Sequence, residues 1–471
     1  MTKIRTIILS CACLLGMAAM TSCTEGGDDQ QPTLVGSSFF LPNSTEETVT
    51  VTMDFDGAWQ ISNNTSTWFS VSPLSGEAGS TDLTFTVFET NPDLSERVGG
   101  FVIEVDGVGT QYYVIQDVTP GFNAPENASV SGSEQEFVLN FYSNIEFEAT
   151  TDADWITIGD IAYEVSTLAD GVTESKYRAY SINLSIAAND GEVRDGVITL
   201  TGNDDSTSAT VTLSQMGELV ADFSRTFYRR SLGMRFTATT CGWCPLMSEA
   251  LHMAYEETEG RLVPFTIYGI MAGSDWMIYD HWLEWLNKFR IEGFPTGNVN
   301  GYAQVNNYDS SITSQIFTGL TEEAAAQLPA NTVIGGSASY DGSNINVNLS
   351  VASKEAGSYI LGIFLMESNI IGNQSGGGAN YQHDFVVKDE FTDYMGDEIS
   401  LSAESVKEFN YSIAVPSNIE NIDNCYICVW TAEEGTYSGS VGYAIYADNG
   451  MLVDNVVTIP MNGFAIFDYE D

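Results

Sequence analysis

Apolar and polar residues alternate in short runs through residues 36–118. Such runs occupy 48–53, 83–88 and 100–105, and residues that favour turns separate them. Alternation with a period of two buries one face of a strand, and short strands at regular spacing are typical of a two-sheet sandwich. The pattern therefore predicts an all-β sandwich over 36–118, with turns at Pro73–Gly76, Asn91–Pro92 and Asp106–Gly107.

Residues 124–217 repeat the frame of this first region. The spacing from arginine to glycine is two residues in both copies, and the second copy carries an insertion of about ten residues around 161–180. A repeat of this kind indicates one structural unit used twice, so we expect two immunoglobulin-like sandwiches with equivalent buried tryptophans. The corresponding residues are Trp68, Asn91, Arg97, Gly99 and Gln116 in the first copy and Trp155, Asn189, Arg194, Gly196 and Gln215 in the second.

The periodicity changes after the second repeat. A strand-like run at 231–237 precedes a helical pattern that starts at Pro245, and the apolar run 262–270 predicts a buried strand. A second amphipathic helix is predicted for 274–289. This alternation of strands and helices indicates an α/β domain over 222–325.

The last third of the chain returns to short alternating runs, with a hairpin turn at 341–344. It is predicted to form a C-terminal antiparallel β-sandwich over 330–471. The whole chain is therefore expected to be multidomain.

The composition is strongly acidic, with 64 Asp and Glu residues against 16 Lys and Arg and a formal net charge of −48. A protein that binds a phosphate backbone needs a basic surface, and the sequence has no local run of Lys and Arg. Nucleic acid is thereby excluded as a general partner.

Residues 1–22 have the order of a secretory signal. Lys3 and Arg5 precede an apolar stretch that ends at Met20, and small residues follow up to Cys23. The segment 20–23 resembles a bacterial lipobox, which implies cleavage before Cys23 and an outer-membrane lipid on its thiol. A soluble secreted protein cut nearby is the alternative.

An acidic run at Glu25–Asp29 lies in the tether predicted for residues 23–35. This run is similar to the surface-export signal of Bacteroidetes lipoproteins, which implies exposure on the cell surface. A solvated spacer is the simpler alternative.

Cys241-Gly-Trp-Cys244 lies between the predicted strand at 231–237 and the helix that follows. A thiolate at a helix N-terminus is stabilised by unpaired backbone N–H groups, so this context favours a redox-active disulfide. We expect Cys241 to be the more exposed cysteine and the nucleophile, and Cys244 to resolve the mixed disulfide. A disulfide that only staples the loop is the alternative.

Cys425 and Cys428 lie in an apolar run that is predicted to be a strand. Positions three apart on a strand face opposite sides, so these two thiols are expected to be buried and unpaired. With only three histidines in the chain, no metal site is predicted, although His383-Asp384 after a glycine-rich loop is a weak alternative.

The first repeat, with Trp68-Phe-Ser-Val-Ser-Pro73 and the frame residues after it, resembles the BACON family. The second repeat lacks the Ser-Pro-x-Ser-Gly turn. The family implies glycan binding, in which Trp59, Trp68 or Phe69 would stack on a sugar. The alternative is that these rings fill the core and the modules act as spacers.

Phe294-Pro295-Thr296 followed by a strand resembles the cis-proline loop of the thioredoxin fold. The resemblance implies that Pro295 faces the cysteine pair and that Trp243, Phe294 and Thr296 help to seat a substrate. Residues 222–325 are therefore expected to be thioredoxin-like.

Residues 222–471 as a whole resemble the Omp-twenty-eight-related outer membrane proteins of Bacteroidetes. The matching pieces are FTATTCGWCP, FPTGNVNG and YQHDFVVKDEFTDYMG. Relatives often carry an acid in the strand before the cysteines, whereas this chain has none there and has Arg235 instead.

Together these features predict an outer-membrane lipoprotein that is a thiol–disulfide oxidoreductase or a redox-active receptor. Its expected partner is a protein thiol or disulfide, with glycan as a further partner and no cofactor. The alternative is a non-enzymatic adhesin whose contact surface includes Trp276, Trp282 and Trp285.

Overall fold

The computed structural model describes residues 34–35, 37–45, 48–203, 206–273, 275–448 and 450–470. The predicted signal peptide, Cys23 and all but the end of the tether lie outside these residues. The described chain is rich in strands and forms two compact units. Of the described residues, one unit comprises those up to Thr119 together with Ser166–Lys176, and the other comprises Pro120–Val165 and those from Tyr177 onward. Within the described residues, no helix has the length and apolar character needed to span a bilayer.

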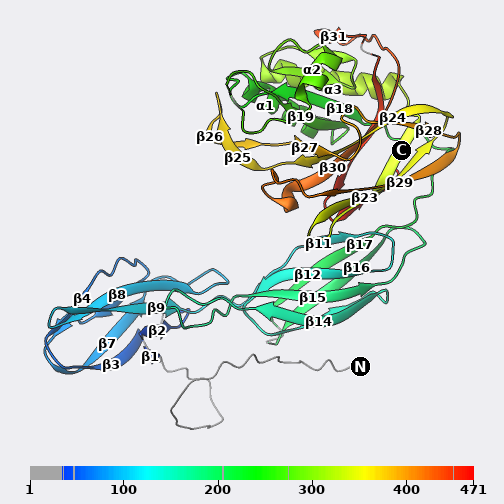
Figure 1. Ribbon diagram of the computed structural model, residues 1–471. Helices are drawn as coiled ribbons and strands as arrows, with labels where there is room; N and C mark the ends of the chain where they lie inside the picture. The colour runs from blue at the N-terminus through cyan, green and yellow to red at the C-terminus, as the bar shows by residue number, and fades with distance from the viewer. Residues whose placement is uncertain are drawn as a thin grey trace. The chain divides into compact units, whose positions relative to one another are not determined.

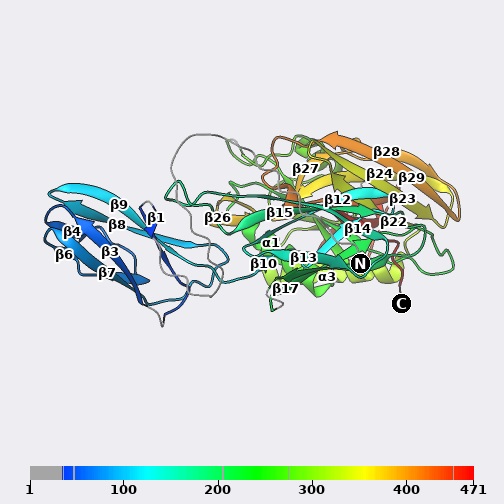
Figure 2. The ribbon, with the colours of Figure 1, turned by 90° about the horizontal axis from the view of Figure 1, so that it is seen from below.

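The first module, drawn in blue in Figure 1, is a sandwich of two sheets around one core. Figure 2 shows β8 and β9 in one layer and β3 and β7 in the other. Buried Val49, Val51 and Phe55 alternate with exposed residues along β3, as the pattern predicted. The first sheet runs β1 (Leu34–Val35), β2 (Ser38–Leu41), β9 (Val108–Gln116), β8 (Arg97–Val105), β4 (Trp59–Ser62), β6 (Ser75–Gly76), and the second runs β3 (Thr48–Phe55), β7 (Gly79–Val87), β5 (Phe69–Ser72).

The second module is also a two-sheet sandwich with its own core. Its β11 pairs in parallel with β17, just as β2 pairs in parallel with β9 in the first module. The repeat predicted from sequence is therefore a repeat of structure. The sheets run β10 (Phe122–Asn123), β12 (Gln135–Ser143), β15 (Arg178–Ile186), β14 (Ile156–Glu164), and β11 (Asn127–Val130), β17 (Ser208–Gln215), β16 (Arg194–Gly202), β13 (Phe147–Thr151).

The repeated asparagine fixes the same loop in both modules. Asn91 Nδ2 donates to the carbonyls of Ser95 and Asp117, at 2.8 and 3.1 Å. Asn189 Nδ2 donates to the carbonyl of Met216, the equivalent residue of the second copy, at 3.2 Å. Buried carbonyls need a donor, so this position requires an amide side chain.

The repeated arginine and glycine surround the repeated tryptophan. The guanidinium carbon of Arg97 lies 5.8 Å from the ring centroid of Trp68, and that of Arg194 lies 4.6 Å from Trp155. A side chain at the glycine two residues later would meet the same tryptophan ring. Trp68 is buried as predicted, whereas Trp155 is only half-buried against its core.

The insertion of the second repeat was expected to be part of the second sandwich. Residues Ser166–Lys176 instead belong to the first compact unit. Asp170 Oδ2 accepts a hydrogen bond from Ser38 Oγ at 2.7 Å, and Glu96 Oε2 accepts one from Ser175 Oγ at 2.7 Å.

A long mixed sheet forms the centre of the C-terminal half. Strands from both sides of the predicted 325/330 boundary belong to it, because β19 pairs in parallel with β27. Its order is β31 (Ala444–Tyr446), β21 (Ala303–Val305), β20 (Thr296–Val299), β18 (Ser231–Thr237), β19 (Leu262–Tyr268), β27 (Val386–Glu390), β24 (Gly357–Glu367), β30 (Cys425–Glu433), β32 (Leu452–Pro460), with β28 (Asp397–Leu401) also paired to β24.

Helices cover both faces of the part of this sheet that contains β18 and β19. The helices α1 (Cys244–Glu257) and α3 (Ser310–Gln327) pack together on one face, and α2 (Trp282–Phe289) packs on the other through Trp285 and Phe289. This arrangement places the N-terminus of α1 at the end of β18.

A second sheet packs on the far part of the long sheet and encloses an apolar core with β24, β30 and β32. It runs β29 (Ser405–Ala414), β23 (Asn344–Ser353), β22 (Thr332–Tyr340), β33 (Gly463–Ala465), and a separate hairpin consists of β25 (Ile370–Gln374) and β26 (Gly378–His383). A short 3-10 helix, η1 (Ile422–Asn424), precedes β30.

The helix predicted over 274–289 is shorter than its pattern suggested, because α2 begins only at Trp282. Asp275 Oδ1 accepts a hydrogen bond from the backbone N–H of Met277, and the N–H of Tyr279 donates to the carbonyl of Tyr268. These bonds commit the backbone before 282 to a turn against β19.

Candidate functional site

Cys241 and Cys244 form a disulfide where β18 leads into α1. Cys244 is the first residue of the helix, and Pro245 occupies its first turn, where a missing N–H leaves no bond unmade. The predicted context of strand, CxxC and helix is therefore present.

The burial of the pair differs from the expectation that Cys241 would be the more exposed cysteine. Both cysteines are only 1% exposed, whereas Trp243 between them is 64% exposed. Ala238 and Phe294 pack against the two cysteines. Local sequence could not predict the contact with Phe294, because that residue is distant from the cysteines in the chain.

The Phe294–Pro295 peptide bond is cis, as the resemblance implied. Phe294 contacts the disulfide directly, as part of the same apolar cluster. Thr296 is buried, and its hydroxyl donates to the carbonyl of Gly293 at 2.7 Å. The substrate roles of Trp243, Phe294 and Thr296 remain predictions.

The tip of the β25–β26 hairpin lies on the loop before the disulfide. Gln374 Nε2 donates to the carbonyls of Cys241 at 2.9 Å and Ala238 at 3.2 Å. The N–H of Ser375 donates to the carbonyl of Thr239 at 2.8 Å. Gln374 was not predicted from the sequence, where its only local signal is the glycine-rich turn that follows it.

Asp275 holds the same loop from another direction. Its Oδ2 accepts hydrogen bonds from the backbone N–H and the hydroxyl of Thr239, at 2.7 and 2.9 Å. The loop that leads to Cys241 is thus fixed by two separate segments of the chain.

A cluster of buried, hydrogen-bonded polar side chains lies beside this loop, on β18, β19 and β26. Arg235 is 2% exposed, and its Nε donates to Thr266 Oγ1 at 3.3 Å. Tyr268 and His383 share a hydrogen bond of 2.6 Å between the hydroxyl and Nδ1. Burial raises the pKa of Tyr268 to about 12. Burial, aided by the charge of Arg235, lowers the pKa of His383 to about 4, so the imidazole is neutral at pH 7.

His383 is therefore a hydrogen-bonded core residue. Throughout the part of the chain that the structure describes, no group of three or more His, Cys, Asp or Glu residues is arranged to hold a metal ion.

Cys425 and Cys428 are unpaired and buried, as predicted. They lie on opposite faces of β30, Cys425 in the core between the two C-terminal sheets and Cys428 in the core beneath α2.

The rings predicted to contact glycan do not present a free face. Trp59, Trp68 and Phe69 are 3%, 7% and 2% exposed, and all three belong to the core of the first module. The rings fill the sandwich, as the alternative interpretation predicted, so they are not available in this fold to stack on a sugar.

The tryptophans that were predicted to form an adhesive surface differ in their exposure. Trp285 is fully buried in the core, Trp282 is half-buried, and only Trp276 is 50% exposed. They do not form one contact surface.

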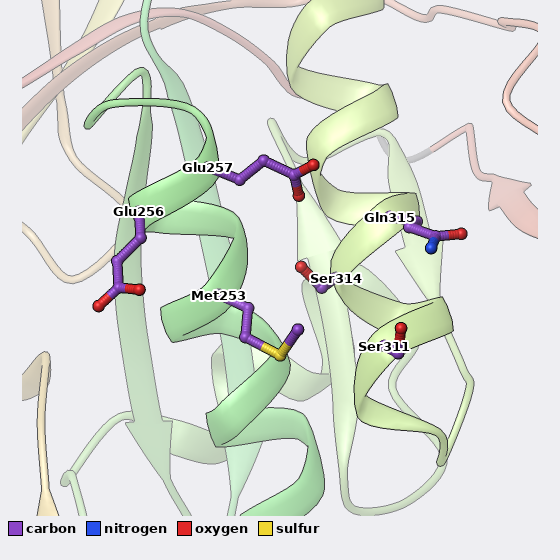
Figure 3. A pocket seen from close by; sticks show the side chains of 6 residues that line it. All are labelled: Met253, Glu256, Glu257, Ser311, Ser314 and Gln315. Atoms are coloured by element: carbon purple, nitrogen blue, oxygen red, sulfur yellow. The ribbon is translucent and has the colours of Figure 1, made fainter.

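A hollow of about 520 Å³ lies between α1 and α3 (Figure 3). Glu257 points across it toward α3 and accepts a hydrogen bond from Thr318 Oγ1 at 3.0 Å, whereas Glu256 points away. The lining residues of α1 start at Met253, well beyond the first turn that contains Cys244. The hollow is therefore separate from the disulfide.

These observations define a β-rich, multidomain protein with a covered disulfide in its C-terminal half. Family comparisons agree with that organisation. Residues 284–441 match the family "Outer membrane protein Omp28". Residues 36–118 match the "Viral BACON domain", and 145–216 match BACON, the "Putative binding domain, N-terminal". These three regions of the chain are thus similar to Omp28 and to BACON domains, which confirms the resemblance predicted from its motifs.

The Omp28 match agrees with an outer-membrane location. It includes the cis-proline loop and the hairpin but begins after Cys241 and Cys244. The predicted resemblance extended further, to residue 222.

No curated protein matches the chain. Among solved structures, HBP35 of Porphyromonas gingivalis is similar at 14% identity, with 50% of this chain and 77% of that chain covered and a TM-score of 0.41. The cadherin-like domains 1 to 4 of zebrafish RET are similar at 10% identity, with 44% and 52% covered and a TM-score of 0.23. A tandem of titin immunoglobulin domains is similar at 10% identity, with 38% and 93% covered and a TM-score of 0.23.

Proposed function

We propose that the protein is an outer-membrane lipoprotein whose residues 231–327 form a thioredoxin-like unit for thiol–disulfide exchange. The observation that carries the proposal is the position of the Cys241–Cys244 disulfide between β18 and the first turn of α1, with Phe294 of the cis-proline loop packed on it. The two BACON-like modules serve as spacers, because the rings that the resemblance assigned to glycan, Trp59, Trp68 and Phe69, lie in the core of the first module.

The order of elements around the pair supports the thioredoxin-like assignment. The strands β18 and β19 are parallel neighbours joined through α1. In contrast, β20 runs antiparallel to β18, β21 runs antiparallel to β20, and α3 follows. A parallel pair followed by an antiparallel pair, with α1 and α3 on one face, brings the cis-proline loop to the disulfide.

Exchange at this pair proceeds in two balanced steps. A thiolate of a partner dithiol attacks Cys241 Sγ, the bond to Cys244 breaks, and Cys244 leaves as a thiolate that takes up a proton. The second thiolate of the partner then attacks the partner sulfur in the mixed disulfide, which releases Cys241. The partner is oxidised and the pair is reduced, and the reverse sequence reduces a partner disulfide. The N-terminus of α1 favours the thiolates that form.

Trapping of the mixed disulfide tests this proposal. Reduced Cys244→Ala protein retains the attacking thiol but cannot resolve the product, so we expect it to accumulate a covalent adduct with a partner from the membrane fraction. Dithiothreitol should release the adduct, and mass spectrometry should locate the cross-link at Cys241.

The double variant Cys241→Ala, Cys244→Ala is the matched control, since it retains Cys425 and Cys428. Adducts of equal yield in this control, or none attached to Cys241, would contradict exchange. The non-enzymatic adhesin would then be the favoured function.

We also propose that Cys23 carries the lipid that anchors the protein. Cys23→Ser is expected to abolish labelling with palmitate and to move the protein out of the outer-membrane fraction. The net charge of −48 supplies no attraction to anionic lipid that could replace the anchor. Cys13→Ser, within the predicted signal, should leave both properties unchanged. Normal membrane fractionation of Cys23→Ser would show that another feature anchors the chain.

A further inference from the structure

Gln374 lies 133 residues from Cys241 in the chain, yet its side chain reaches the backbone that leads to the disulfide. The residue is 2% exposed, and its amide nitrogen is 2.9 Å from the Cys241 carbonyl and 3.2 Å from that of Ala238. We propose that Gln374 is a positioning residue for the Cys241–Cys244 pair, which holds the loop in the conformation that joins the two sulfurs and so favours the disulfide over the dithiol. This role rests on the proposed exchange function.

The backbone around Gln374 fixes where its amide points. The N–H of Ser375 donates to the carbonyl of Thr239 at 2.8 Å. Gly376 has a φ of +80°, and a Cβ at this position would lie 2.3 Å from the carbonyl oxygen of Gly242. The hairpin tip thus contacts the CxxC loop so closely that glycine is required there. Gln374 directly precedes the residues that make this contact, so its backbone is held next to the CxxC loop.

The two carbonyls require a hydrogen-bond donor from the hairpin. Carbonyl oxygens only accept, and of the two ends of a glutamine amide only the NH₂ donates. A carboxylate of the same length cannot make these bonds and places a negative charge against two buried oxygens. A methionine has nearly the same length and volume but no donor. Replacing Gln374 with methionine therefore removes the hydrogen-bond donor while it largely preserves the packing.

The hydrogen bonds of Gln374 are coupled to the state of the sulfurs through the carbonyl of Cys241. When the disulfide is reduced, the sulfurs are no longer constrained to bonding distance, so the loop loses that constraint. A contact made more strongly with the loop of the disulfide form must favour that form by the same free energy. Asp275 holds Thr239 independently, so loss of Gln374 leaves the loop attached on its other side.

The test compares Gln374→Met and Gln374→Glu with the wild-type protein in glutathione redox buffers, with the dithiol fraction trapped by alkylation and read by mass. For Gln374→Met we expect the equilibrium constant for disulfide formation to fall about tenfold, which is about 30 mV for a two-electron couple. Gln374→Glu should show an equal or larger fall. A residue that served only in packing would leave this constant unchanged in the methionine variant.

Gln382→Met is the matched control. Gln382 is on the same hairpin, but its amide donates to Asn369 and Asp384 instead of the CxxC loop. Its equilibrium constant should equal that of the wild type. A Gln374→Met constant within twofold of the wild type, or an equal change in the control, would overturn the proposal.

The experiment uses glutathione and no protein partner, so its outcome is distinct from that of the trapping experiment. If no partner is trapped but the Gln374 variants shift the equilibrium, the exchange function fails while the positioning effect stands. If a partner is trapped and the variants do not shift the equilibrium, the exchange function stands and the positioning effect fails.

Discussion

Replacement of Asp454 with alanine is expected to lower the free energy of unfolding by about 3–5 kcal/mol, because it leaves a buried arginine without its counter-ion. Asp454 Oδ1 lies 3.8 Å from Arg229 Nη1, and the two side chains are 7% and 3% exposed. The carboxylate also accepts hydrogen bonds from the backbone N–H groups of Asn331 and Thr332, at 3.0 and 2.7 Å. Its loss therefore also removes the acceptor of these two backbone donors, of which the Thr332 N–H is fully buried.

Burial has opposite effects on the two partners of this pair. It raises the pKa of Asp454 against the opposing influence of Arg229, and it lowers the pKa of Arg229 against that of Asp454. Each charge is thus costly to bury and depends on the other. Asp454→Asn retains the shape but removes the negative charge, so we expect it to be destabilising as well.

Urea unfolding followed by tryptophan fluorescence measures this effect. Asp468→Ala is the matched control, because Asp468 pairs with the neighbouring Arg230 where the side chains are 43% and 25% exposed. An exposed pair of this kind contributes about 1 kcal/mol or less. Equal losses in Asp454→Ala and Asp468→Ala would show that the buried pair does not stabilise the sheet.

The second large effect is expected in the reactivity of the cysteines after reduction. At pH 8, Cys425 should react with iodoacetamide at least about a thousandfold more slowly than Cys241. Burial, reinforced by the charge of Glu367, raises the pKa of Cys425 to about 12. Only about one molecule in ten thousand then has this thiol as the reactive thiolate. Burial likewise raises the pKa of Cys428, which should be equally inert.

The raised pKa of Cys425 also determines how its alkylation rate changes with pH. Because the raised pKa keeps Cys425 protonated, its rate should increase about tenfold for each pH unit until the pH approaches 12. Alkylation at each site is measured by mass spectrometry at several pH values. If Cys425 reacts as fast as Cys241 at pH 8, either the strand β30 opens readily or Cys241 is a structural cysteine.

The two BACON modules show how far local pattern can determine structure. Alternation predicted their strands, and the repeated Asn91 and Asn189 bind equivalent carbonyls in equivalent loops. The same pattern could not decide whether Trp68 packs inward or binds glycan, because both roles use an aromatic residue on a strand. Burial of the ring in the folded sandwich answered that question.

The helix at 274–289 was overestimated for a related reason. Its apolar spacing fits a helix throughout, but Asp275 binds Met277 and the loop at Thr239. Such side-chain bonds compete with helical backbone bonds, and they form only when the partner segment is nearby.

The sequence alone determined the elements whose information is local or repeated. These are the two sandwiches, the strand and helix on either side of the CxxC, the cis Phe294–Pro295 bond inferred by resemblance, and the inward-facing Cys425 and Cys428. Periodicity suffices there because each strand or helix must bury its own apolar face.

Only the tertiary structure decided what covers the disulfide. Gln374 and its hairpin reach Cys241 across 133 residues, and strands from both predicted C-terminal domains join in one sheet. No local pattern encodes such contacts, because a side-chain amide has the same sequence signature whether it faces water or a distant carbonyl. Its partner is fixed by the fold of the whole sheet, and that fold buries Cys241, which was expected to be the more exposed cysteine, as deeply as Cys244.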